Sequence, residues 1–115
     1  LILVLQLHLH RQQVRLQLST TLQAIYSQTL LPKVDGAGRV VAYEVLVCVP
    51  AIRSIIREGK THQIFSVLQS GGKYGMNTLD SWLKELYQKG VVSIEEAMAK
   101  SSNPQEFEKM AMKAF

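Results

Sequence analysis

Residues 29–49, TLLPKVDGAGRVVAYEVLVCV, decide the fold class because two runs of β-forming residues flank a turn sequence. Asp35, Gly36 and Gly38 supply the turn, since Asp hydrogen-bonds nearby backbone and glycine tolerates positive φ. We therefore predict a β-hairpin with strands near 29–34 and 39–48. Pro32 indicates an edge or a bulge in the first strand. A lone hairpin is marginally stable, so this one is expected to complete a larger sheet or to pair with another chain.

Residues 11–28, which precede the hairpin, are predicted to form a helix. Their apolar residues recur every three to four positions, which places them on one helical face. These residues are Val14, Leu18, Leu22 and Ile25.

Short helices are predicted for the rest of the chain. Pro50 and Gly59 delimit the helix AIRSIIRE at 51–58, because proline suits the first helical position and glycine suits the position after the last. Capping residues begin two later helices: Ser93 with Glu96, and Asn103 with Pro104. The fold class is thus α/β, with a helix and a hairpin followed by a helical bundle.

Composition describes a small globular domain. The chain has 115 residues, of which 47% are hydrophobic and 19% charged, with a net charge of +4. The basic residues are scattered and no aromatic platform accompanies them, so the charge does not indicate nucleic-acid binding. Cys48 is the single cysteine, in an apolar run. It fits a buried core thiol in a reducing compartment better than a nucleophile.

The first ten residues, LILVLQLHLH, carry leucine at every second position, which is typical of a strand. His8 and His10 then share a face, but two histidines without a third ligand are weak grounds for a metal site. The apolar run is too short to span a membrane, so no membrane insertion is expected. Because the chain starts at Leu1, either it is processed or it is a piece of a longer protein.

No catalytic motif is found in the sequence. The stretch SGGKYGMNT at 70–78 resembles a phosphate-binding loop, but Tyr74 stands where Ser or Thr is needed and Val67 where the first glycine is needed. A glycine-rich loop between helices fits better. His62 fits a surface or capping role. Glu44 lies in an apolar strand, where it needs either an arginine partner or an exposed position. Catalytic, cofactor-binding and metal residues are therefore all predicted to be absent.

The helix at 51–58 combines an apolar stripe with a basic edge. Ile52, Ile55 and Ile56 form the stripe, and Arg53 and Arg57 are four apart on another face. From the residues alone, this edge reads best as a solvated surface.

Longer stretches resemble the C-terminal part of the PilT family of type IV pilus retraction (twitching-motility) ATPases, in the secretion ATPase superfamily. SQTLLPKVDGAGRVVAYEVL resembles the end of that family's RecA-like ATPase core. AIRSIIRE resembles its AIRNLIRE signature, and GMNTLDSWLKELYQKGVVSIEEA resembles its helical tail. The resemblance covers about residues 14–110, and the first ten residues depart from it.

The resemblance implies a C-terminal segment of a hexameric motor, cytoplasmic at the inner-membrane face, that uses ATP and Mg²⁺ to retract a pilus. The family's Walker A, Walker B, Asp-box and His-box motifs lie before the matched region, so this chain alone is expected to be inactive. Expected partners are neighbouring subunits of a homo-hexamer and inner-membrane pilus proteins. The alternative is a stand-alone helical protein-binding module or regulator without ATPase activity.

The resemblance also implies a division of the chain and a set of contact residues. Residues 1–10 form an apolar N-terminal segment, 11–48 the end of the RecA-like core, and 49–115 a C-terminal helical domain. The residues of the interaction and retraction motif implied in this way are Ala51, Ile52, Arg53, Ile56, Arg57 and Glu58. The isoleucines of this helix are expected to dock it on its domain, while Arg53, Arg57 and Glu58 are expected to face a neighbouring subunit or an inner-membrane pilus protein.

Overall fold

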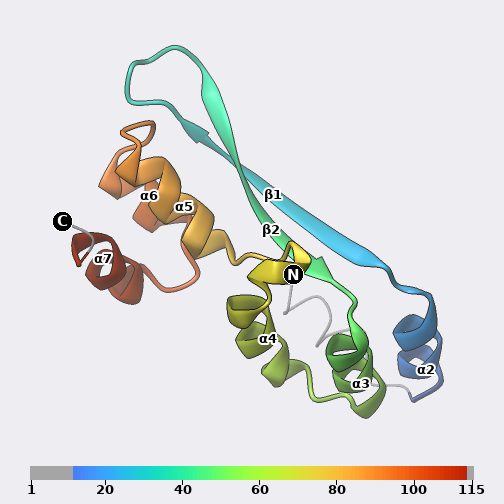
Figure 1. Cartoon of the computed structure of the whole chain (residues 1–115). Helices are drawn as coiled ribbons and strands as arrows, with labels where there is room; N and C mark the ends of the chain where they lie inside the picture. Colours follow the sequence, from blue (N-terminus) through green and yellow to red (C-terminus); the bar gives the residue numbers. More distant parts are fainter. Residues whose placement is uncertain (1–11, 114–115) are drawn as a thin grey trace. The chain divides into compact units, whose positions relative to one another are not determined.

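The structure is a computed structural model that describes residues 12–113. A helix, α2 (Gln12–Thr21), leads into strand β1 (Ala24–Pro32), which pairs with β2 (Arg39–Val47) in a two-stranded antiparallel sheet (Figure 1). Helical elements follow in this order: α3 (Pro50–Glu58), the 3₁₀ turn η1 (Thr61–Gln63), α4 (Ile64–Ser70), η2 (Gly72–Tyr74), α5 (Leu79–Gln88), α6 (Ile94–Lys100) and α7 (Pro104–Met112). This order confirms the predicted fold class. The strand and histidine pair predicted within residues 1–10 lie outside the described part.

The predicted turn chemistry closes the hairpin. Asp35 Oδ1 accepts a hydrogen bond from the Ala37 N–H at 2.8 Å, and Gly36 and Gly38 adopt φ angles of 73° and 95°. The Lys33 N–H donates to the Gly38 carbonyl oxygen at 3.0 Å, which joins the two strands beside the turn.

The predicted helix over 11–28 is wrong in its second half, because α2 ends at Thr21 and β1 begins at Ala24. Ile25 therefore lies in a strand, and the first strand starts five residues before the predicted Thr29. The physical reason is tertiary, since the Cys48 N–H donates to the Gln23 carbonyl oxygen at 2.9 Å and so extends the pairing of the strands.

The chain folds as two compact units, each with its own core. The first unit comprises residues 12–27 and 45–77 of the described chain, and the second comprises 28–44 and 78–113. The boundary between the two units passes through both strands, so it differs from the predicted domain boundary after residue 48. The predicted domain boundary stays a prediction.

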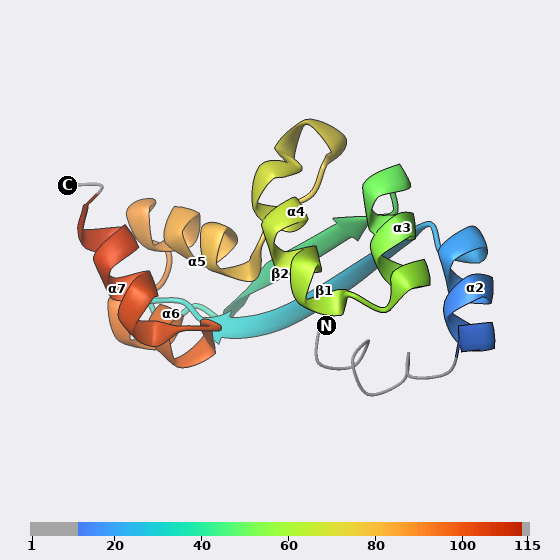
Figure 2. The same cartoon turned by 90° about the horizontal axis from the view of Figure 1, so that it is seen from below.

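The first unit is built around α3. Helix α2 packs chiefly against α3, and α4 lies against α3 on another side, as both views show (Figures 1 and 2). The core of this unit consists of Leu46, Cys48, Ile52, Ile55, Ile56, Ile64, Leu68 and Met76. After η2 the chain returns to the sheet, where Val45 and Asn77 form an antiparallel bridge with N···O distances of 3.1 and 3.2 Å.

The second unit joins the turn end of the hairpin to α5, α6 and α7. Its core contains Leu31, Ala42, Leu83, Leu86, Val92, Ala97, Phe107 and Ala111. The predicted caps are confirmed, because Ser93 Oγ accepts from the Glu96 N–H at 3.2 Å and Asn103 Oδ1 accepts from the Glu106 N–H at 3.3 Å. No helix within residues 12–113 is long and apolar enough to cross a membrane.

Candidate functional site

Helix α3 is delimited by the predicted residues. Pro50 occupies its first position, and the preceding Val49 is extended at φ −67° and ψ 165°, as a residue before proline prefers. Gly59 ends the helix in the left-handed conformation at φ 72°, and its N–H bonds to the carbonyl oxygens of Ile55 and Ile56. These two ends set the length of α3.

The six residues of the predicted retraction motif fall into three groups. Ile52 and Ile56 are fully buried, so they hold α3 on its unit and are not available to a partner. Ala51, Arg57 and Glu58 are exposed. Arg53 is half-buried, and its Nη1 donates to the Ser19 carbonyl oxygen of α2 at 2.8 Å. The predicted basic edge is therefore divided: Arg53 has an intramolecular role and Arg57 faces outward.

The exposed charges at the end of α3 differ in their partners. Glu58 Oε2 lies 3.4 Å from Lys60 Nζ, with both side chains about half-exposed. Within residues 12–113 the Arg57 guanidinium has neither a hydrogen-bond nor an ion-pair partner. An unpaired guanidinium on a rigid helix offers five donors in a planar fork, which suits a carboxylate on a partner.

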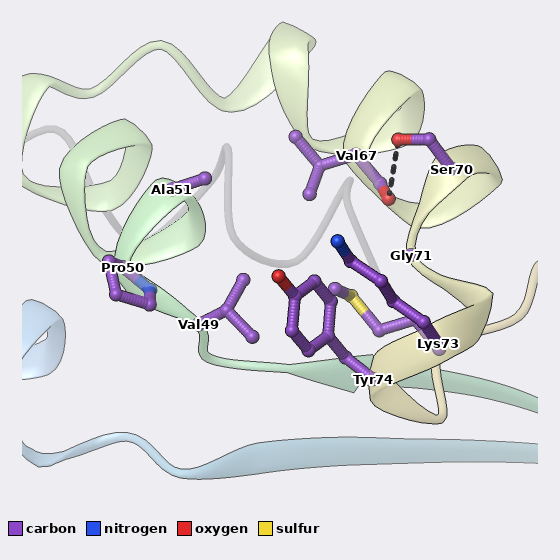
Figure 3. A pocket seen from close by; sticks show the side chains of 9 residues that line it. Val49, Pro50, Ala51, Val67, Ser70, Gly71, Lys73 and Tyr74 are labelled. Carbon is purple, nitrogen blue, oxygen red and sulfur yellow. Dashed lines mark hydrogen bonds between the residues drawn. The ribbon is translucent and has the colours of Figure 1, made fainter.

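A groove opens beside the first turn of α3, between that turn, the end of α4 and η2 (Figure 3). This α3–α4 groove has a volume of about 490 Å³. Its apolar walls are Val49, Pro50, Ala51, Val67 and Met76, and its polar lining includes Ser70, Lys73 and Tyr74. The exposed start of the motif helix therefore forms one wall of a concave surface.

The Lys73 ammonium and the Tyr74 hydroxyl extend into the groove between α3 and α4 (Figure 3). Lys73 Nζ stands 5.0 Å from the centroid of the Tyr74 ring, a cation–π distance. The Ser70 hydroxyl instead donates to the carbonyl oxygens of Ser66 and Val67, at 3.1 and 3.4 Å. Lys73 is thus the cation that the groove presents to a ligand.

The sequence reasoning missed Lys73 and Tyr74 as site residues, because it tested the stretch 70–78 only as a phosphate-binding loop. The prediction of a glycine-rich connection between helices is confirmed, with η2 inside it. The available signal was an exposed Lys-Tyr pair bounded by Gly72 and Gly75. Tyr74 is 51% exposed, so its ring is accessible beside the groove.

The basic excess of the described chain lies in the first unit. That unit holds five basic residues, Arg15, Arg53, Arg57, Lys60 and Lys73, against a single acidic residue, Glu58, for a net charge of +4. The second unit holds seven basic and eight acidic residues among those described, for a net charge of −1. The surface around α3 therefore attracts acidic partners.

The remaining candidate residues take structural positions. Burial raises the pKa of the Cys48 thiol, against a smaller lowering effect of the Arg53 charge, which fits the predicted core thiol. Glu44 is half-buried, and its Oε1 accepts from the Leu79 N–H at 3.3 Å, so its partner is the start of α5. His62 is exposed in η1, as predicted. Among the described residues no cluster of three or more His, Cys, Asp or Glu is placed to hold a metal.

Comparison with known proteins finds relatives with related descriptions. The chain is 47% identical over 97 residues to the type IV pilus retraction ATPase PilT of Pseudomonas aeruginosa, an alignment that covers 84% of this chain and 28% of that protein. It is 44% identical over 93 residues to a twitching motility protein of Neisseria gonorrhoeae, covering 81% of this chain and 25% of that protein. No protein-family model matches the chain.

A solved structure matches across both units. The crystal structure of the pilus retraction motor PilT with bound ADP aligns with a TM-score of 0.81 and 40% identity, covering 96% of this chain and 32% of that one. The chain thus spans between a quarter and a third of the length of these relatives, and it matches their C-terminal part.

Proposed function

Because this chain is homologous to the C-terminal part of the PilT type IV pilus retraction ATPases, we propose that it acts as the C-terminal segment of such a retraction motor. In this proposal it makes contacts that couple ATP hydrolysis to pilus retraction. The partners are neighbouring subunits of a homo-hexamer and pilus proteins at the inner-membrane face, and the site of action is cytoplasmic. In the whole motor, ATP and Mg²⁺ bind to family motifs that are not among these 115 residues.

The observation that carries the proposal is the division of α3 into a buried and an exposed side. Ile52 and Ile56 are fully buried, which fixes the helix rigidly on its unit. Ala51 and Arg57 are exposed on the same rigid helix. A helix held in this way can transmit a movement of its unit to a partner, because the contact residues do not move independently of the core.

The proposal is tested by a chimera in which residues 12–113 replace the matching C-terminal part of Pseudomonas aeruginosa PilT. The chimera is expressed in a strain without its own PilT. We expect it to hydrolyse ATP and to restore twitching motility. A chimera that is folded and hydrolyses ATP, yet supports no twitching, contradicts the proposed coupling role.

A further inference from the structure

We infer that the α3–α4 groove binds a segment of a partner protein in which an acidic side chain lies next to a large apolar one. This inference deepens the proposed function and rests on it, since it specifies the chemistry of the partner that α3 contacts. Three independent features of the first unit support it: the apolar walls, the position of Lys73 and the distribution of charge.

The apolar walls provide the anchor site. Val49 and Ala51 contribute from the start of α3, Val67 from α4, and Met76, which is only 4% exposed, from the segment after η2. The volume of about 490 Å³ lies within the range of pockets that enclose specific ligands. Methionine in such a wall adapts its shape to different apolar groups. A leucine or an aromatic side chain of a partner therefore fits this half of the groove.

The polar half selects a carboxylate. The Lys73 ammonium carries a full positive charge and three donors, and the Tyr74 hydroxyl can donate beside it (Figure 3). The ring of Tyr74 lies 5.0 Å from Nζ and helps to hold the ammonium in position. A carboxylate bound here accepts charge-assisted hydrogen bonds next to the apolar anchor.

The electrostatic field of the first unit favours an acidic partner over a basic one. Glu58 is the sole carboxylate among the described residues of this unit, and Lys60 lies 3.4 Å from it. No carboxylate of the described first unit therefore neutralises Lys73. The net charge of +4 steers an acidic segment toward the groove and speeds its association.

A protein segment fits better than an anionic membrane surface. Membrane recognition of this kind uses about four to eight Lys or Arg side chains clustered on one face. Here Arg53 is engaged with the Ser19 carbonyl oxygen and Lys60 with Glu58, and the groove itself holds one cation in a concave surface. A flat lipid surface cannot fill a concavity, whereas a protruding side chain can.

The test uses the 115-residue chain and three capped hexapeptides, followed by NMR with ¹⁵N and methyl detection. The first peptide carries leucine and phenylalanine flanked by two aspartates, the second has asparagines for the aspartates, and the third has serines for the two apolar residues. We expect the first to bind with a dissociation constant on the order of 100 μM. The shifted signals are expected at Val49, Ala51, Val67 and Met76. The second and third peptides are expected to bind at least threefold more weakly.

Two variants locate the charge effect. Lys73→Met is expected to weaken binding of the acidic peptide about threefold to fivefold, the value of an exposed ion pair, and to leave the asparagine peptide unaffected. Lys60→Met removes the same charge from the same unit outside the groove and is expected to change binding less than twofold. Equal weakening by both variants overturns the inference, because it indicates a general charge effect.

Other outcomes also overturn it. The first is the absence of any NMR shift up to millimolar acidic peptide. The second is binding of the chain to vesicles with one-third phosphatidylserine, if Lys73→Met abolishes that binding. The third is self-association of the chain, if Lys73→Met disrupts it. The last two identify a membrane or a second copy as the occupant. If the peptide test fails while the chimera supports twitching, the proposed function stands and only the inference about the groove is overturned. A chimera that is folded and hydrolyses ATP, yet supports no twitching, contradicts the proposed function whatever the peptides do.

Discussion

The guanidinium of Arg53 is bonded to the Ser19 carbonyl oxygen of α2 at 2.8 Å, across 34 positions of sequence. Ser19 lies in the last turn of α2, where backbone carbonyls lack partners within the helix and the dipole favours a positive charge. One side chain of α3 therefore completes the end of another helix. This bond separates Arg53 from Arg57, which lies four residues later and faces outward.

The first prediction concerns the different roles of these two arginines in stability. Arg53→Met is expected to lower the free energy of unfolding by about 1 kcal/mol, because a half-buried, charge-assisted hydrogen bond is lost and the Ser19 carbonyl loses its partner. Arg57→Met is expected to change it by less than about 0.5 kcal/mol, as for most exposed substitutions. Urea unfolding followed by circular dichroism measures both. Equal losses in the two variants are incompatible with the assigned roles.

The second prediction concerns Gly59, where a methyl group would stand 2.7 Å from Arg15 Cζ. Gly59→Ala is expected to destabilise the chain by about 1 kcal/mol, because φ is 72° there, whereas the flexible end of the Arg15 side chain can move aside at little cost. Gly90→Ala is the matched control, since its φ is 74° and nothing lies within 4 Å of the added methyl. It carries the backbone cost alone. Thermal unfolding is expected to show similar losses for the two variants, and a Gly59→Ala variant as stable as the parent chain contradicts the backbone cost.

The third prediction concerns Glu44 and the start of α5. Glu44→Gln is expected to lower stability by about 0.5 kcal/mol at low salt, because the carboxylate accepts from the Leu79 N–H at the positive end of the helix. The loss should shrink in 1 M NaCl, where the charge is screened. Glu108→Gln removes an exposed carboxylate within α7, away from any helix start, and serves as the control. A Glu44→Gln effect that does not depend on salt argues against the helix-end interaction.

The fourth prediction concerns Cys48, whose pKa burial raises. The folded state holds this thiol protonated, so its contribution to stability is complete below the ordinary thiol pKa of about 8.5 and is lost as pH rises above it. Cys48→Ala lacks this contribution, so its stability should fall less between pH 8 and pH 10 than that of the parent chain. A thiol-reactive dye should label the parent chain only on unfolding. Rapid labelling of the native chain at pH 8 contradicts the burial.

Local signals in the sequence predicted the ends of several elements correctly. Pro50 and Gly59 delimit α3, and Asn103 caps α7, because each acts on backbone groups within a few residues of itself. The Asp35 turn belongs to the same class. The stripe of Ile52, Ile55 and Ile56 was also predictable, since helical period alone places these residues together.

Features that depend on distant residues were not predictable. Ile25 continued a helical spacing begun by Val14 and Leu18, yet it belongs to a strand because the Cys48 N–H pairs with the Gln23 carbonyl oxygen. The partner of Glu44 was expected to be an arginine or solvent, but it is a helix start 35 positions away. The division between Arg53 and Arg57 has the same cause, since the helical period places both on one edge and Ser19 decides between them.

The central claim, that the exposed side of α3 couples hydrolysis to retraction, is tested most directly by Arg57→Ala in the chimera. The measurement is the twitching rate divided by the ATP hydrolysis rate. Arg39→Ala, an exposed arginine at the start of β2, is the control. We expect Arg57→Ala to keep the hydrolysis rate within about twofold of the parent chimera and to lower the twitching rate about tenfold or more. A tenfold loss corresponds to a charged contact worth about 1.4 kcal/mol. Arg39→Ala is expected to preserve both rates. Twitching by Arg57→Ala at the rate of the parent chimera contradicts the claim.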